Sequence, residues 1–215
     1  MAPPHLDTSV VPAIATVAAA DTPLPKAGHE IVVTPLVLSG LALIEMPVWR
    51  DTRGFFIERF HAATFKALGL PYRFVQDNHS RSRPGVLRGL HYQNDPAQGK
   101  LVGVTRGRIW DVAVDLRAGS PTFGQSVGVE LNDTDGRLLW IPAGFAHGFC
   151  VLGDEPADVM YKVDAPYNPR TERGILWRDA DLAIKWPVAD PIVSDRDAAL
   201  PWLSELGQTV GPVGG

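Results

Sequence analysis

A histidine and an arginine lie three positions apart near the middle of the chain, in the run Gly85-Val86-Leu87-Arg88-Gly89-Leu90-His91. Histidine is the side chain best suited to moving protons near neutral pH. Arginine has the shape and charge to bind a phosphate or a carboxylate. This pairing predicts proton transfer on a bound anionic ligand.

The spacing of these two residues raises a geometric difficulty. Strict alternation along a strand places Arg88 and His91 on opposite faces of a sheet. Gly89 lies between them, and a β-bulge there would bring both side chains to one face. Gln93 and Lys100 follow closely in the sequence, which favours a functional His91 over a histidine that is only packed in the core.

Four further residues are candidates for the same chemistry. His147 lies among small residues where a strand can point it into a barrel, although packing explains it equally well. Asp179 could pair with a histidine and fix its tautomer, or it could be an exposed loop acid. Tyr161 and Tyr167 could supply a phenolic proton, and packing is the alternative for both.

The sequence argues against a metal, a nucleophilic triad and a nucleotide fold. His91-Tyr92-Gln93 lacks the second imidazole of a His-x-His metal pair, and no Cys-x-x-Cys occurs. Cys150 lies in an apolar run, Gly-x-Ser-x-Gly is absent, and no phosphate loop is present. We therefore expect no catalytic metal, with any phosphate held by side chains.

The composition limits the classes of binding partner that we expect. The chain has 215 residues, a formal charge of −4 and 45% hydrophobic residues, as expected for a globular protein that does not bind nucleic acid. The sequence contains no apolar run of about 20 residues, so we expect no membrane span. One cysteine is consistent with a reducing, cytoplasmic location. Basic residues cluster locally, as anion ligands or as a solvated face: Arg81, Arg83, Arg88, Arg106 and Arg108.

The first 30 residues are rich in Ala, Pro and Thr, which predicts a disordered leader. No Lys or Arg precedes Lys26, so this segment lacks the basic start of a signal peptide. We expect one folded domain over residues 31–215. Its strands should begin near Ile31-Val32-Val33.

Most of that domain has the alternating pattern of strands broken by Gly and Pro. Helical patterns are short, at His61–Leu68 with Gly69 as a cap and after Ser194-Asp195-Arg196-Asp197. These features predict an all-β, antiparallel jelly roll with a few short helices. The clearest strand patterns are Val102–Leu116 with a turn at Arg106-Gly107, then Val127–Leu131, Arg137–Ile141 and Val159–Val163.

Taken together, the segments from about Asp51 to Leu206 resemble the dTDP-4-dehydrorhamnose 3,5-epimerase family. The motifs that carry the resemblance are Asp51-Thr52-Arg53-Gly54-Phe55-Phe56-Ile57-Glu58, Phe74-Val75-Gln76-Asp77-Asn78-His79-Ser80, Gly85 to His91, Gln98-Gly99-Lys100, Asp111 to Arg117, Ser120 to Gly124, Gly144 to Phe149, Tyr161, Tyr167-Asn168-Pro169 and Asp179 to Pro187. Each is weak alone, and their shared order is specific.

The resemblance implies a cupin-like jelly roll and a homodimer with no metal or organic cofactor, acting on a dTDP-4-keto-6-deoxyhexose. By resemblance, His91 is the catalytic base paired with Asp179, Lys100 stabilises the enolate and Tyr161 is the acid. Arg88 resembles a ligand of the diphosphate, and Arg53 and Glu58 resemble a strand lent to the partner's nucleotide. Further positions match the pocket: Phe56, Gln76, Asn78, His147, Tyr167 and Glu172.

The expected reaction inverts C3 and C5, the two carbons beside the C4 ketone, in dTDP-L-rhamnose synthesis. Three alternatives stay open from the sequence. The enzyme could invert one carbon only, for an antibiotic sugar. The chain could also be a non-catalytic cupin that binds a sugar nucleotide, or a metal-dependent cupin oxygenase.

Overall fold

The computed structural model describes residues 15–16 and 30–206. The expected disordered leader therefore lies outside the described residues, apart from Ala15, Thr16 and Glu30. After the two-residue strand at Ala15–Thr16, the next strand of the described residues begins at Val32.

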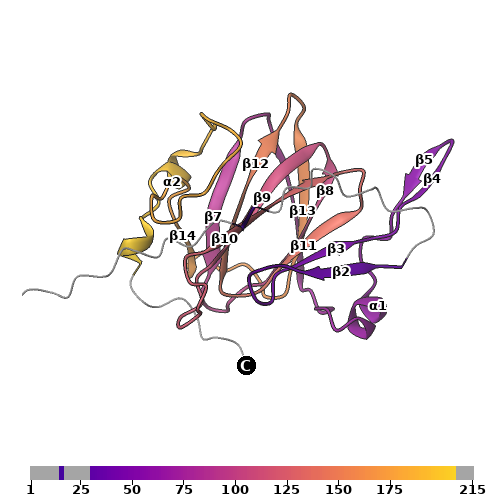
Figure 1. The fold of residues 1–215 in the computed structure, drawn as a ribbon, viewed down its shortest axis with the longest axis horizontal. Coiled ribbons are helices and arrows are strands. Elements are labelled where there is room, and N and C mark those ends of the chain that lie inside the picture. Colours follow the sequence, from indigo (N-terminus) through magenta and orange to yellow (C-terminus); the bar gives the residue numbers. More distant parts are fainter. Residues whose placement is uncertain (1–14, 17–29, 207–215) are drawn as a thin grey trace, which may run out of the picture.

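Two six-stranded sheets make up the body of the molecule (Figure 1). The first has the order β1 (Ala15–Thr16), β10 (Ser126–Asn132), β9 (Arg108–Asp115), β12 (Phe145–Leu152), β7 (Leu87–Gln93) and β14 (Glu172–Gly174). The second has the order β2 (Val32–Pro35), β3 (Ala42–Glu45), β11 (Arg137–Ile141), β8 (Lys100–Arg106), β13 (Ala157–Val163) and β6 (Gln76–Ser82). All strand pairs within the two sheets are antiparallel except β1 with β10.

The core lies between the two sheets because alternate residues of each strand point inward. Val102 of the second sheet and Ile109 of the first are both fully buried in this cluster. The predicted Gly107 turn joins their strands with φ +77°. The expectation of an antiparallel, cupin-like jelly roll is confirmed.

Two smaller apolar clusters cover the outer faces. On the second sheet, Phe65 of α1 (Ala62–Ala67) packs with Ile44 and Trp140. On the first sheet, the chain after β14 packs Leu182 and Leu203 over Val114. That chain includes α2 (Asp195–Ala198) and the short 3₁₀ helix η1 (Leu203–Glu205).

The two predicted helix starts and the predicted cap are confirmed. The His61 side chain accepts a hydrogen bond from the Thr64 backbone at the start of α1, and Gly69 follows its end with φ +72°. The Ser194 hydroxyl accepts from the Asp197 backbone N–H at 3.1 Å at the start of α2.

A third, two-stranded sheet stands apart from the barrel. It is a hairpin of β4 (Trp49–Asp51) and β5 (Gly54–Phe56), and it projects well beyond the second sheet in Figure 1. Every residue of the two strands is exposed. None of the described helices is long and apolar enough to cross a membrane.

Candidate active site

The two sheets enclose a cavity of about 420 Å³, a size typical of small-molecule sites. Both sheets and the loop that carries α2 contribute to its wall. The lining residues are Gln76, Asn78, Ser80, Arg88, His91, Tyr92, Gln93, Gln98, Lys100, His147, Gly148, Phe149, Tyr161, Tyr167, Glu172, Ser194, Arg196 and Asp197.

A β-bulge at Gly89 brings Arg88 and His91 into this cavity together, as the sequence predicts. His91 pairs with His147 across β12, whereas Arg88 pairs with Phe149, so two residues of β7 face one of β12. Gly89 has φ +114°, and a Cβ there would lie 2.6 Å from the Gly148 Cα atom. Only glycine fits this crowded, left-handed position.

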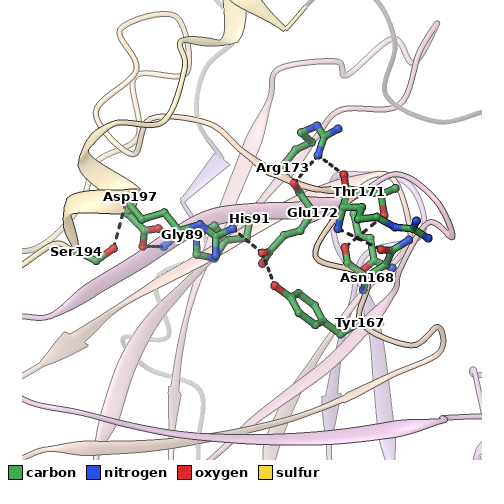
Figure 2. A network of polar contacts seen from close by, with 12 residues as sticks. Gly89, His91, Tyr167, Asn168, Thr171, Glu172, Arg173, Ser194 and Asp197 are labelled. Carbon is green, nitrogen blue, oxygen red and sulfur yellow. Dashed lines mark hydrogen bonds and ion pairs between the residues drawn. The ribbon is translucent and has the colours of Figure 1, made fainter.

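The His91 imidazole is held by the carboxylate of Asp197 and not by that of Asp179. His91 Nε2 lies 2.7 Å from Asp197 Oδ1, and Asp197 Oδ2 accepts from the Gly89 backbone N–H at 3.1 Å. Figure 2 shows the Asp197 side chain reaching His91 and Gly89 from helix α2. The expected pairing of His91 with Asp179 is therefore wrong.

Asp179 is buried elsewhere, with both oxygens occupied by backbone groups. Its Oδ1 atom accepts from the N–H groups of Asp181 and Leu182, and its Oδ2 atom accepts from that of Leu203 at 2.6 Å. These bonds explain why it is not free to face a histidine. It is not a residue of the cavity wall.

The charge of Asp197 is stabilised in place. Burial alone would raise the pKa of its carboxyl group, but the hydrogen bonds from His91 and from the Gly89 backbone outweigh burial and lower the pKa. A charged carboxylate on one ring nitrogen fixes the tautomer and the orientation of His91. The other ring nitrogen is the one available to a ligand.

A second histidine–carboxylate pair lies beside the first. His147 Nε2 contacts Asp111 Oδ1 at 2.7 Å, and the Asp111 side chain is fully buried. His147 and His91 are register partners on neighbouring strands, so both imidazoles line the same wall.

Lys100 is the buried cation of the site. It is 7% exposed, and burial lowers its pKa to about 8, an effect partly offset by the carboxylates of Glu172, Asp164 and Asp111. Because the site is buried and its effective dielectric constant is low, the ammonium group interacts strongly with negative charge that develops near it.

Tyr161 lines the cavity from β13, in the sheet opposite the one that carries His91. Burial raises the pKa of its phenol, and the nearby charge of Glu172 raises it further. The phenol therefore keeps its proton at neutral pH and can act as an acid.

The mouth of the cavity is a network of polar and aromatic side chains (Figure 2). Tyr167 donates to Glu172 Oε2 at 2.9 Å, and Arg196 donates to the same oxygen at 2.5 Å. Gln76 bonds Asn78 at 2.8 Å and accepts from the Tyr167 backbone at 3.0 Å. These groups can bind both a ring system and charged oxygen atoms.

Most of the basic residues singled out in the sequence face solvent. Arg81 pairs with Asp158 at 2.6 Å, Arg106 lies 3.6 Å from Glu155, and Arg108 is 3.3 Å from Glu130. The solvated-face interpretation holds for these three, whereas Arg88 lines the cavity and is held by the Ser82 hydroxyl at 2.8 Å.

Three of the expected binding residues lie outside the cavity wall. Arg53 and Phe56 belong to the β4–β5 hairpin region, Glu58 follows it, and all three are exposed. Arg53 pairs with its neighbour Asp51 at 2.5 Å. Within one subunit, the structure does not bring them to the other site residues.

Sequence reasoning missed Asp197, Arg196 and Asp111. The Ser194-x-x-Asp197 spacing was interpreted as a helix cap alone, although it is also what places Asp197. Asp111 had a usable signal, because it is a carboxylate in the middle of strand β9 with apolar residues on both sides. In the described part of the chain, no group of three or more His, Cys, Asp or Glu is placed to hold a metal.

An enzyme that inverts a carbon needs a base on one side of its substrate and an acid on the other. The two sheets place a histidine, His91, and a tyrosine, Tyr161, on opposite walls of the cavity. Fold and site together define a jelly-roll epimerase. The family model described as dTDP-4-dehydrorhamnose 3,5-epimerase matches residues 35–205, and the chain belongs to this family.

Three relatives illustrate the family. The dTDP-4-dehydrorhamnose 3,5-epimerase of Shigella flexneri is 55% identical over 157 residues, covering 72% of this chain and 86% of that protein. The dTDP-4-dehydrorhamnose 3-epimerase of Streptomyces niveus is 41% identical, covering 76% and 79%. The crystal structure of dTDP-6-deoxy-D-glucose-3,5-epimerase from Legionella pneumophila, in complex with dTDP-4-keto-L-rhamnose, has a TM-score of 0.81, with 47% identity and coverage of 85% and 98%.

Proposed function

We propose that this chain inverts C3 and C5 of dTDP-4-dehydro-6-deoxyglucose, as a cofactor-independent, cytoplasmic 3,5-epimerase of dTDP-L-rhamnose biosynthesis. The observation that carries the proposal is the placement of the His91–Asp197 pair and Tyr161 on opposite walls of one cavity, with Lys100 buried in the same cavity. The relatives from Shigella flexneri and Legionella pneumophila support this substrate class.

The chemistry follows from the ketone at C4, which acidifies the hydrogens on C3 and C5. His91 removes one of these protons, and the electron pair of the broken C–H bond moves to the C4 oxygen as an enolate. The Lys100 ammonium group neutralises that oxygen. Tyr161 then donates its proton to the opposite face of the carbon, which restores the ketone with inverted configuration. Solvent returns the base and the acid to their starting states.

The remaining cavity residues suit the nucleotide. Arg88 offers a fork of N–H donors for the diphosphate. Tyr167 is 49% exposed at the mouth and offers a face for stacking of the thymine ring. Gln76, Asn78 and Glu172 provide hydrogen-bond partners for thymidine, and His147 completes the wall beside the sugar.

We further propose that the enzyme is a homodimer in which each site is completed by the partner's hairpin. The β4–β5 hairpin carries exposed Phe55 and Phe56 away from its own barrel, which is an unfavourable arrangement for a monomer in water. On this proposal, Arg53, Phe56 and Glu58 act at the nucleotide of the partner subunit.

The test is NMR of dTDP-4-dehydro-6-deoxyglucose incubated with the protein in deuterated water. We expect deuterium at both C3 and C5. Label at one carbon would instead establish a single-carbon epimerase, as the relative from Streptomyces niveus is named. Binding without any label would establish a non-catalytic sugar-nucleotide protein.

A pair of variants controls the assay. His91→Ala should abolish incorporation at both carbons. His79→Gln should leave it unchanged, because His79 lies on β6 at the outer surface, with its side chain 52% exposed and 3.7 Å from Asp158. Equal loss in both variants would argue against His91 as the base.

A further inference from the structure

The segment that delivers Asp197 to the site is not part of either sheet. Residues 191–206, here called the C-terminal strap, run across the outer face of the first sheet after the last strand (Figure 1). Arg196 and Asp197 are the strap residues that reach Glu172 and His91. The completeness of the site therefore depends on how the strap is seated.

The strap is attached on both sides of these two residues. Before them, the Ile192 backbone exchanges hydrogen bonds with Gly85 and Leu87, each at 2.9 Å. After them, the Pro201 carbonyl accepts from the Leu176 backbone N–H at 2.8 Å, and Leu203 N donates to Asp179 Oδ2 at 2.6 Å. The last of these bonds is made by a side chain.

The surroundings of Asp179 favour its contact with the strap. Its side chain is 3% exposed, and within the described residues it has no ion pair with a lysine, arginine or histidine. Its side-chain oxygens accept hydrogen bonds from three backbone N–H groups, two from its own loop and one from the strap 24 positions away. A buried carboxylate is costly unless all its bonds are made, so the site favours the seated strap.

We propose that Asp179 is a positioning residue of the epimerase, which seats the C-terminal strap through the Leu203 backbone and so holds Asp197 against His91 and Arg196 against Glu172. The catalytic role of this positioning rests on the proposed function. Asp179 itself touches no reacting atom.

The first experiment asks whether Asp179 acts through Asp197. Asp179→Asn keeps the size of the side chain but replaces the acceptor facing Leu203 with an amide of the wrong polarity. We expect kcat to fall about 10–100-fold, as for other residues that orient a catalytic group. In an Asp197→Asn background, the same change should cost less than about twofold, because the contact it supports is already lost.

A merely structural role gives a different result, since it lowers kcat by the same factor in both backgrounds. That outcome would overturn the proposal. Asp181→Asn is the matched control, because Asp181 lies in the same loop, is exposed and uses only its backbone N–H in this contact. It should retain wild-type kcat and KM.

A second pair of variants removes the same bond from the strap side. Leu203→Pro deletes the N–H donor, and it suits the first position of η1 after the extended Trp202. Leu203→Ala removes the side chain and keeps the donor. We expect the proline variant to lose kcat beyond the loss in the alanine variant, and equal losses would count against the proposal. This pair remains decisive if Asp179→Asn folds poorly.

A readout independent of the substrate keeps the two proposals distinguishable. Amide hydrogen exchange should become at least about tenfold faster over residues 191–206 in Asp179→Asn, while β8 and β9 stay protected as in the wild type. Unchanged exchange in the strap would refute the positioning role even if the wild type proved inactive on the dTDP sugar. An inactive wild type with a loosened strap in the variant would count against the function alone.

Discussion

His91 and Asp197 are 106 positions apart in the chain, yet the imidazole Nε2 and the carboxylate Oδ1 meet at 2.7 Å. The carboxylate is 6% exposed and is fixed by a second bond from Gly89, so it has one available orientation. A histidine held in this way has a defined tautomer, with its free nitrogen directed away from the carboxylate.

Asp197→Asn should therefore lower kcat by about 10²–10⁴-fold, because the amide cannot support the same tautomer or stabilise the imidazolium that forms. The KM should change little, since the nucleotide contacts lie elsewhere in the cavity. Steady-state kinetics measure both. Asp195→Asn, an exposed acid of the same short helix, should remain close to wild type.

The protonation of Lys100 predicts how the rate depends on pH. Its pKa is lowered to about 8 by burial, and the ammonium form is the one that neutralises an enolate. The rate should therefore fall as pH rises through about 8. Tyr161 does not account for this limb, because burial raises the pKa of its phenol above the ordinary value of 10.0.

The pH profile of Lys100→Met provides the check. Its residual activity should be lower throughout and should lack the fall near pH 8. If the fall persisted at the same pH in this variant, a different group would be responsible for it.

The strands were predictable because their chemistry is local. In Val127–Leu131, alternate apolar residues face the core, and glycines with positive φ close turns such as Gly107 and Gly136. The helix at His61 was predictable for the same reason, since its cap bonds lie within three residues. In each case the residues that interact are close neighbours in the sequence.

The carboxylate partner of His91 depended on tertiary structure instead. Asp179 and Asp197 both lie in the segment after the last strand, β14. The residues next to each of them in the sequence do not indicate which one reaches the cavity. The answer depends on the path of the strap, which is set by distant contacts such as Ile192 with Gly85. Lys100 and Tyr161, which the family resemblance assigns to the pocket, line the cavity from strands β8 and β13.

Tyr161→Phe should separate proton removal from inversion. Without the phenol, His91 can still remove the proton and return it to the same face after exchange with solvent. We expect deuterium to enter the substrate carbons while inversion falls by about 10²–10⁴-fold. Proton NMR in deuterated water follows exchange and configuration together. Loss of exchange in parallel with inversion would argue against a base and an acid on separate walls.

The bulge at Gly89 should not tolerate a methyl group. In Gly89→Ala the Cβ atom would lie 2.6 Å from Gly148 Cα and 2.7 Å from the His147 carbonyl oxygen, at a φ of +114°. The left-handed backbone costs about 1–2 kcal/mol, and the overlap adds about 1–3 kcal/mol. Chemical denaturation should show a loss of this combined size, accompanied by loss of activity.

Gly119→Ala separates the two contributions. Gly119 has φ +75° and open space around its Cβ position, so only the backbone cost applies and activity should survive. Equal destabilisation of the two variants would show that the contact with β12 does not constrain the bulge.

The exposed hairpin predicts that two inactive variants can restore activity when mixed. One variant carries His91→Ala, which disables its own barrel, and the other carries Arg53→Ala with Phe56→Ala, which disables the hairpin it lends. Each homodimer should be nearly inactive. After unfolding and refolding together, a mixed dimer has one site with an intact barrel and an intact hairpin. Random pairing of subunits in a twofold dimer then gives about a quarter of wild-type activity. A mixture no more active than its components would mean that each barrel works with its own hairpin or with none.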